Sequence, residues 1–324
     1  MEFIHSILEN DQPVVAGDIK SYDLPVNPLS HTLVTLKYTR TDAAADGIPT
    51  YPVVIALLPK IEVLYKGSAI FSMSGADAVA CGLLVCGFES WAHNYLGVAV
   101  EETSFTFLVP MGRVLYDPKE CFPRSTRGEL ILQLTYMSGA LAGVTTLKAQ
   151  IETVELPDAS PEQYLRMTTL TKTTEAAGEH DVELPIGNPI SELVIFGEVF
   201  PAADADDATI GFVQVLIDNY RRFYSHSNFE TLHNMAGRMR PPPGWWFGHQ
   251  HWQEAVTSLS GWQFPGNHLL KEYVHVPFDI FRDGRYILDT AGKSDVIVRI
   301  HVDTPAKQDM RVIPCEIVPT GRGF

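Results

Sequence analysis

Apolar and polar residues alternate with a period of two through much of the chain. Three segments show this most clearly, 34–38, 130–136 and 296–302, in which apolar side chains occupy every second position. That period directs successive side chains to opposite faces of a β-strand. Gly, Pro, Asn or Asp interrupts the apolar runs about every 8–12 residues, which is typical of a β-sandwich or barrel. Helical periodicity is weak, so we expect only short helices, at 89–96 and 252–259.

The strand pattern occurs twice. The segment Asp23–Ser30 returns, with one inserted glycine, as Glu183–Ser191, about 160 residues later. Solenoid repeats have periods of roughly 20–50 residues, so this spacing indicates a duplicated domain. Further similar segments follow in the same order: 38–46 with 198–206, 64–68 with 223–227, 109–110 with 276–277, 129–136 with 295–302, and 151–154 with 315–318. The sequence therefore predicts two tandem all-β domains.

The repeat divides the chain into four parts. Pro157 and Pro161 indicate a hinge between the two domains, and the threonine-rich stretch 164–174 predicts an extra strand there. The predicted parts are, in order, an N-terminal amphipathic arm (1–12), the first domain (13–157), a linker (158–179) and the second domain (180–324).

The N-terminal arm is predicted from its spacing. Phe3, Ile4, Ile7 and Leu8 recur at helical intervals within Met1–Asn10. A segment this short does not hold a helix alone in water. It therefore either docks on its own domain or lies on a partner subunit or a lipid surface.

The second domain contains a longer insertion than the first. The extra length includes Pro241–Gly248, a segment of prolines and aromatic residues. Long loops in compact β domains are usually functional surfaces. We expect an ordered projection over 241–248, with the alternative that the aromatic residues pack the base of the loop.

Composition and charge limit the classes of function. The chain has 324 residues, of which 45% are apolar and only 19% are charged, so it has material for two cores and less charge than usual. This suits a protein that hides much surface in neighbours, and equally a β protein rich in Gly and Pro. The net charge of −15 excludes nucleic-acid binding by general phosphate attraction. It also opposes binding to anionic lipid unless an apolar element compensates.

The cysteines form no metal or disulfide framework. Cys81, Cys86, Cys121 and Cys315 are scattered, without a CxxC pair, so we expect a reducing compartment. The acidic start gives no signal peptide. The longest apolar run, Ala78–Phe88, is about half a membrane span. We therefore expect a soluble product made in the cytosol.

Candidate metal sites are weak. His249 and His251 form the only HxH, followed by Glu254, but this spacing is shorter than in cupins and the first domain lacks a counterpart. Two acidic turns offer oxygen ligands for calcium, although no EF-hand spacing is present. We interpret them as solvated turns; their residues are Asp42 and Asp46 in the first domain and Asp204, Asp206 and Asp207 in the second.

Other candidate residues favour structural roles. Four arginines are too few for a nucleic-acid patch in so acidic a chain. Trp91, His93 and Tyr95 are more typical of a core than of a sugar-stacking site. No GxSxG, GxGxxG, P-loop or HExxH motif occurs. We therefore predict no catalytic residue, no cofactor and no metal site. The four arginines are Arg221, Arg222, Arg238 and Arg240.

The order of these features resembles a known family. The Leu-Pro-x-Asn-Pro corners at 24–28 and 184–189, the segment Ile61–Gly67, the duplicated strands and the enlarged second-domain loop carry the likeness. They resemble the double jelly-roll major capsid proteins of membrane-containing, tailless icosahedral viruses. That lineage includes the bacterial viruses PRD1 and PM2, related archaeal viruses and adenovirus. The likeness covers the chain from about residue 13 to its end.

This resemblance implies a fold and a role. The fold is two tandem eight-stranded jelly rolls with short helices in loops. Three chains form a homotrimeric, pseudo-hexameric capsomer, and capsomers tile an icosahedral shell over an internal lipid membrane. The expected partners are copies of the chain, minor capsid or penton proteins, and the membrane, contacted through the arm 1–12. The protein is expected in the virion after synthesis in the host cytoplasm, without enzymatic activity.

Two alternatives remain open. A two-domain sandwich that binds glycans requires exposed aromatic residues in a groove and a secretion signal. A bicupin-type metalloenzyme requires stoichiometric metal at His249 and His251.

Overall fold

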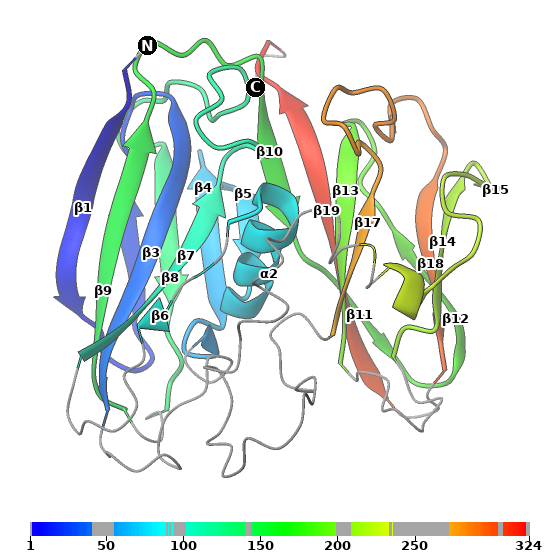
Figure 1. Cartoon of the computed structure of the whole chain (residues 1–324), viewed down its shortest axis with the longest axis horizontal. Coiled ribbons are helices and arrows are strands. Elements are labelled where there is room, and N and C mark those ends of the chain that lie inside the picture. Colours follow the sequence, from blue (N-terminus) through cyan, green and yellow to red (C-terminus); the bar gives the residue numbers. More distant parts are fainter. Residues whose placement is uncertain are drawn as a thin grey trace, which may run out of the picture. The chain divides into compact units, whose positions relative to one another are not determined.

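The computed structural model describes residues 2–40, 55–88, 90, 92–93, 102–139, 144–198, 209–232, 235, 272–303 and 307–321. Within this part of the chain, the residues up to Leu165 form one compact unit and those from Arg166 onward form a second. Both units are built mainly from β-strands, which are labelled in Figure 1.

The first unit is a sandwich of two antiparallel sheets. One sheet has the strand order β1-β9-β3-β7-β6, and the other has the order β2-β8-β4-β5. The strands are β1 (Ile4–Pro13), β2 (Ile19–Asp23), β3 (Leu29–Arg40), β4 (Lys60–Tyr65), β5 (Ser68–Met73), β6 (Ala92–His93), β7 (Glu102–Pro110), β8 (Leu130–Thr135) and β9 (Val144–Glu155).

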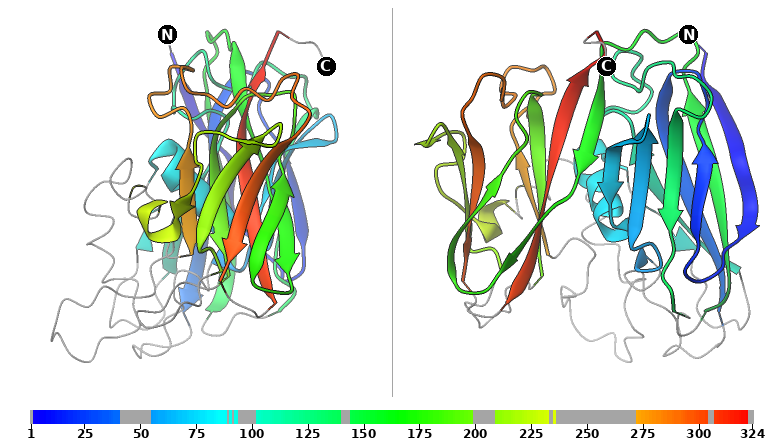
Figure 2. Two further views of the ribbon diagram at one scale, coloured as in Figure 1. Left: turned by 90° about the vertical axis from the view of Figure 1, so that its right-hand side faces the viewer. Right: turned by 180° about the vertical axis from the view of Figure 1, so that it is seen from behind.

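The second unit is also a two-layered sandwich, seen from the side and from behind in Figure 2. Its sheets have the orders β11-β19-β13-β17 and β12-β18-β14-β15, and the short β16 also pairs with β14. Strand β10 (Gln163–Thr168) carries the chain across the boundary between the units. The other strands are β11 (Leu170–Thr174), β12 (Gly178–Glu183), β13 (Ile190–Gly197), β14 (Phe212–Ile217), β15 (Tyr220–Arg221), β16 (Ser227–Asn228), β17 (Tyr273–Pro277), β18 (Val296–Val302) and β19 (Gln308–Pro319).

The two units share one topology. The order β1-β9-β3-β7 corresponds strand for strand to β11-β19-β13-β17, and β2-β8-β4-β5 corresponds to β12-β18-β14-β15. In both units the first and last strands are neighbours, and most connections cross from one sheet to the other, whereas β4–β5 and β14–β15 are hairpins within one sheet. This is the arrangement of a jelly roll. The predicted fold of two tandem jelly rolls is therefore confirmed.

Alternating burial confirms the predicted strand periodicity. Buried and partly exposed positions alternate along the whole of β8 and β18. The buried side chains of both sheets meet in the core of each unit, as Val34 does in the first and Leu193 and Val298 do in the second. Burial of this apolar surface is the main favourable term in the stability of each sandwich.

Helix α2 (Gly75–Cys86) follows β5 in the first unit. The Ser74 hydroxyl accepts a hydrogen bond from the Asp77 N–H, and Gly87, at φ 70°, ends the helix in the left-handed region. Buried residues occur on every face of α2, so the helix has no exposed polar face. An apolar run with no polar face does not reveal whether it is a helix or a buried strand, which is why this helix was not predicted.

Neither of the two predicted short helices is observed in the described part of the chain. In the segment 89–96, residues Ala92–His93 form strand β6 instead, so this prediction is wrong there. The segment 252–259 lies outside the described residues. The predicted extra strand at 164–174 is two strands, β10 and β11, with Thr169 between them.

The N-terminal segment is a strand rather than a helical arm. Residues Ile4–Pro13 form β1, which pairs antiparallel with β9. In so short a window, apolar spacing does not separate a helix from an irregular strand, and the hydrogen bonds supplied by β9 decide the outcome. The predicted helical spacing is therefore wrong, and the segment is part of the first jelly roll.

Two of the predicted repeat pairs are out of register. The hairpin turn after β4, at Lys66 and Gly67, corresponds to Asp218 and Asn219 after β14, because both turns place two residues at positive φ. The segment 64–68 therefore does not match 223–227. Likewise, the pairing of β9 and β19 with β3 and β13 aligns Glu155 with Glu316, and not 151–154 with 315–318.

The Asn-Pro corner of each unit is held by a glutamate from the last strand. Asn27 Nδ2 donates a hydrogen bond to Glu155 Oε2 at 2.8 Å, and Asn188 Nδ2 donates to Glu316 Oε2 at 3.1 Å. Both glutamates are buried, at 8% and 1% exposure. The repeated asparagine therefore ties the start of one strand to the end of another far along the chain.

The backbone of the two corners is also bonded alike. The Pro28 carbonyl accepts from the Leu156 N–H, and the Pro189 carbonyl accepts from the Ile317 N–H, both at 2.8 Å. A proline has no N–H to donate, so the chain leaves one sheet there and its carbonyl is satisfied by another strand. The duplicated motif thus specifies a duplicated bend.

The two corner glutamates provide a matched test. Arg166 binds Glu316 through Nε at 2.9 Å and Nη2 at 2.6 Å, whereas Asn27 is the side-chain partner of Glu155 among the described residues. We expect Glu316→Gln to lower the free energy of unfolding by about 2–3 kcal/mol and Glu155→Gln by about 1 kcal/mol, because hydrogen bonds to charged groups are the stronger ones. Urea unfolding followed by circular dichroism measures both; equal losses contradict the expectation.

Candidate functional surfaces

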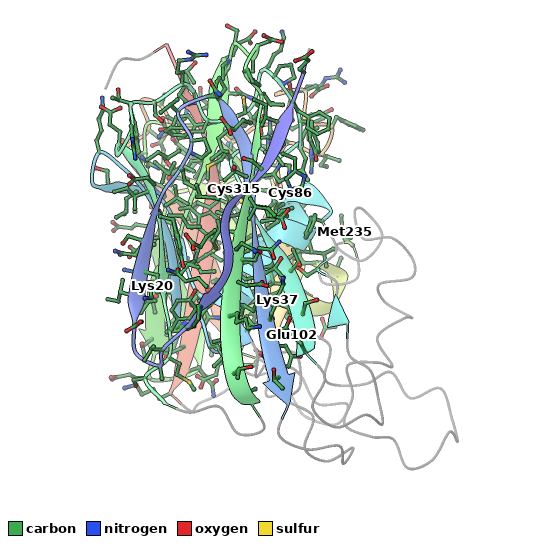
Figure 3. The ribbon with its side chains drawn as sticks, turned by 90° about the vertical axis from the view of Figure 1, so that its left-hand side faces the viewer. Lys20, Lys37, Cys86, Glu102, Met235 and Cys315 are labelled. Carbon is green, nitrogen blue, oxygen red and sulfur yellow. The ribbon has the colours of Figure 1, made fainter. Side chains whose placement is uncertain are left out.

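The outer face of the first unit carries a network of polar side chains across three strands. Lys37 Nζ of β3 donates to Asp11 Oδ1 at 2.6 Å and to Gln150 Oε1 of β9 at 2.7 Å. Gln150 in turn donates to Glu152, whose other oxygen lies 2.7 Å from His5 Nε2 of β1. Figure 3 views this face, with Lys37 labelled. The polar groups of this face are paired with one another, and such exposed pairs contribute little to stability.

The loop that follows β7 is fixed by a buried ion pair. Arg113 and Glu120 are each only 5% exposed and lie 2.7 Å apart, from Nη2 to Oε2. Gln163 also donates to Glu120 Oε2 at 2.8 Å. Burial acts to raise the pKa of the Glu120 carboxyl, but the contacts with Arg113 and Gln163 outweigh it and lower that pKa. The pair therefore ties Arg113 and Glu120, seven residues apart, to each other across this loop.

A neutral histidine lies beneath aromatic side chains at one end of this unit. His31 is 2% exposed, and its Nδ1 lies 2.9 Å from the Ser30 hydroxyl, which accepts a hydrogen bond from the Tyr116 N–H. The ring of Tyr116 stands edge-on to both His31 and Phe3. Burial, with a smaller contribution from His5, lowers the pKa of His31 to about 4.

This histidine makes stability depend on pH. In the unfolded chain it takes up a proton near pH 6.5, whereas in the folded chain it does so near pH 4, so stability falls as pH drops between these values. A shift of that size corresponds to about 3 kcal/mol. We expect His31→Gln to flatten the pH dependence of urea unfolding between pH 7 and pH 4. His226→Gln, which removes an exposed histidine, should keep the wild-type slope; an unchanged slope in His31→Gln contradicts the assignment.

The edges of the first unit are apolar and exposed. Strand β1 is the edge of one sheet and β2 is the edge of the other. Phe3, Ile7, Val15 and Ile19 are each more than half exposed along these edges. A groove of about 570 Å³ lies between the two strands and the Asn-Pro corner. Exposed apolar side chains grouped beside a groove mark an interaction surface.

The second unit has a different exposed edge. The β14–β15 hairpin turns at Asp218 and Asn219, and Tyr220 beyond the turn is 70% exposed. Arg221 and Arg222 follow it and are exposed. Neither guanidinium has an ion pair within the described part of the chain.

The outer face of the other second-unit strands is charged and aromatic. Arg299 of β18 binds Asp181 of β12, with Nε 2.6 Å from Oδ1, and this contact lowers the pKa of Asp181. Beside it, the ring of Phe212 is stacked between His226 and His301, with centroids 4.0 and 4.6 Å apart. As in the first unit, charged groups on this face are paired with one another, here Arg299 with Asp181.

Most of the residues considered as catalytic or metal ligands lie outside the part of the chain that the structure describes. His249, His251 and Glu254, the acidic turns at 42–46 and 204–207, Trp91 and Tyr95, and the segment 241–252 lie outside the described residues. His93 is in β6, and its side chain is not described. Among the described residues, no group of three His, Cys, Asp or Glu side chains is placed to hold a metal, and no helix is long and apolar enough to cross a membrane.

Sequence reasoning missed the two exposed edges. Arg221 and Arg222 were noted only as a weak nucleic-acid patch, and the apolar residues of β1 were assigned to a helix. At both edges, exposed apolar or aromatic residues lie next to charged residues that form no ion pair within the described residues. A sequence pattern cannot show this, because it does not say which strands are edges.

Solved structures share this fold over its whole length. The MCP of STIV superposes with a TM-score of 0.66 at 12% identity, over 99% of this chain and 98% of that one. The major capsid protein P2 of bacteriophage PM2 gives 0.60 at 12% identity, over 100% of both chains. The PBCV-1 virus capsid gives 0.61 at 11%, over 100% of this chain and 96% of that one. Neither a family model nor a curated protein matches the sequence.

These likenesses establish the fold. The chain has the double jelly-roll fold of major capsid proteins from icosahedral viruses, as the resemblance in its sequence indicated.

Proposed function

We propose that this chain is the major capsid protein of an icosahedral virus, with a structural and not a catalytic role. One observation carries the proposal: a single match to the STIV MCP includes both jelly rolls, and it covers 99% of this chain and 98% of that one. A match to one sandwich alone is common to many functions. A tandem pair matched end to end is a far more restrictive likeness.

Assembly into trimers follows from the number and shape of the units. Two similar sandwiches per chain, taken three times around an axis, give six similar blocks, which is a tile with a nearly hexagonal outline. Jelly rolls pair most of their strand edges internally, so tiles meet through side chains and loops and not through uncontrolled strand addition. Closed symmetry within the trimer, and repeated contacts between trimers, build an icosahedral shell.

The remaining partners belong to this proposal. The shell encloses an internal lipid membrane, and minor capsid or penton proteins complete it at its vertices. The mature protein is located in the virion after synthesis in the host cytoplasm. Residues 4–13 are strand β1, and we propose that the N-terminal segment contacts the membrane as part of this strand and not as a helical arm.

The oligomeric mass tests the assembly. We expect the purified protein to have three times its chain mass of 35.9 kDa in mass photometry, and to show threefold particles of hexagonal outline in negative-stain images. A monomer at every concentration, with no particles on raising concentration, contradicts the proposal.

Metal content tests the enzymatic alternative. We expect less than about 0.1 equivalent of Fe, Mn, Ni or Zn per chain by elemental analysis, because a metalloenzyme site is occupied stoichiometrically. One equivalent that disappears in His249→Ala/His251→Ala, with the trimer intact, shows a metal site that the capsid role does not explain.

A further inference from the structure

The groove of the first unit has one apolar wall and two unpaired carboxylates. Leu8 of β1 and Pro25 and Val26 of the corner line it, together with Glu9, Asp23 and Arg127. Within the described residues, neither Glu9 nor Asp23 forms an ion pair. By contrast, Asp11 and Asp18 nearby are paired with lysines. The lining therefore combines apolar surface with two carboxylates and one guanidinium, so its net charge is negative by one unit.

The β14–β15 hairpin of the second unit has the opposite character. It presents Tyr220, Arg221 and Arg222, which are exposed and positively charged as a group. Tyrosine and arginine are the residue types most enriched at the energetic centres of protein interfaces. Arginine also forms the strongest hydrogen-bonded pairs with carboxylates, because its planar fork binds both oxygens.

The hairpin is held in a fixed shape. The Arg222 N–H donates to the Val215 carbonyl at 2.9 Å, and the Val215 N–H donates to the Tyr224 carbonyl at 2.8 Å. The Tyr224 hydroxyl then donates to the Pro277 carbonyl at 2.7 Å. Because these bonds order the hairpin before any partner arrives, little conformational entropy is lost when it binds.

The corresponding hairpin of the first unit lacks these features. Its turn is Lys66-Gly67, and Lys66 Nζ lies 3.7 Å from Glu129 within the same unit. Ser68 and Ala69 follow the turn, where Tyr220 and Arg221 follow it in the second unit. The two copies of the hairpin therefore differ: only the second-unit copy has a tyrosine and an arginine after its turn.

We propose that residues Tyr220–Phe223 of one copy dock in the β1–β2 groove of a second copy. Arg221 and Arg222 pair with Glu9 and Asp23, and Tyr220 covers the apolar wall. This inference rests on the proposed function and names the contact that joins its subunits. Two different surfaces meet, so each copy offers one of each and the contact repeats around an axis until a ring closes.

Charge reversal tests the contact. We expect Arg221→Glu/Arg222→Glu and Glu9→Lys/Asp23→Lys each to raise the concentration at which the oligomer half-dissociates by more than about tenfold in mass photometry. The chain with all four substitutions should recover most of the loss, because the charges are exchanged rather than removed. Arg285→Glu is the matched control, an exposed second-unit arginine paired with Asp283, and should keep the wild-type value.

A second variant separates the apolar part of the contact. Tyr220→Ala should weaken assembly by about tenfold or more at any ionic strength, whereas Tyr286→Ala, which removes another exposed tyrosine, should not. Thermal unfolding of all variants should match the wild type, since the substituted side chains are on the surface.

The outcomes distinguish the two proposals. If the wild type assembles and both charge-reversed variants assemble equally well, this contact is wrong and the capsid proposal stands. If reversal weakens assembly but the fourfold variant does not recover it, the pairing of these two surfaces is wrong. If the wild type does not assemble at all, both proposals fall.

Discussion

The fold depends on the bend at each Asn-Pro corner. The chain leaves one sheet and enters the other there, and the bend is held because a glutamate on the last strand of the unit accepts the asparagine side chain. The contact joins residues that are 128 positions apart in both units. It closes the sandwich by fixing the second and third strands against the last, and burying a carboxylate for this purpose is tolerated only because its hydrogen bonds are made.

The two copies of this corner have diverged in one respect. Glu155 holds its corner with Asn27, whereas Glu316 also binds Arg166 through two nitrogens. The added charge suits the deeper burial of Glu316, because a carboxylate removed from water needs a cation or several donors. The hairpins have diverged as well. The Lys66-Gly67 turn of the first unit corresponds to the Asp218-Asn219 turn of the second, which is followed by the exposed Tyr220. Duplication supplied the scaffold, and the surfaces of the two copies then diverged.

Many polar groups on the outer faces of the two units are paired with neighbouring groups of the same face. The outer face of the first unit pairs Lys37 with Asp11 and Gln150, and that of the second pairs Arg299 with Asp181. The groove at β1–β2 and the hairpin at β15 differ because, within the described part of the chain, Glu9, Asp23, Arg221 and Arg222 form no ion pair and apolar side chains lie beside them.

The sequence by itself determined the alternation of β8 and β18, the duplicated corner and the two-sandwich architecture, because each depends on local spacing or on a repeated motif. It did not determine that Ile4–Pro13 is a strand, since its helical spacing was as good a match and only pairing with β9 decided between them. Nor did it reveal α2, whose uniform apolar composition has no period to interpret. The tertiary structure alone decided which strands are edges and which charges lack partners, because both properties depend on residues that are distant in the chain and adjacent in space.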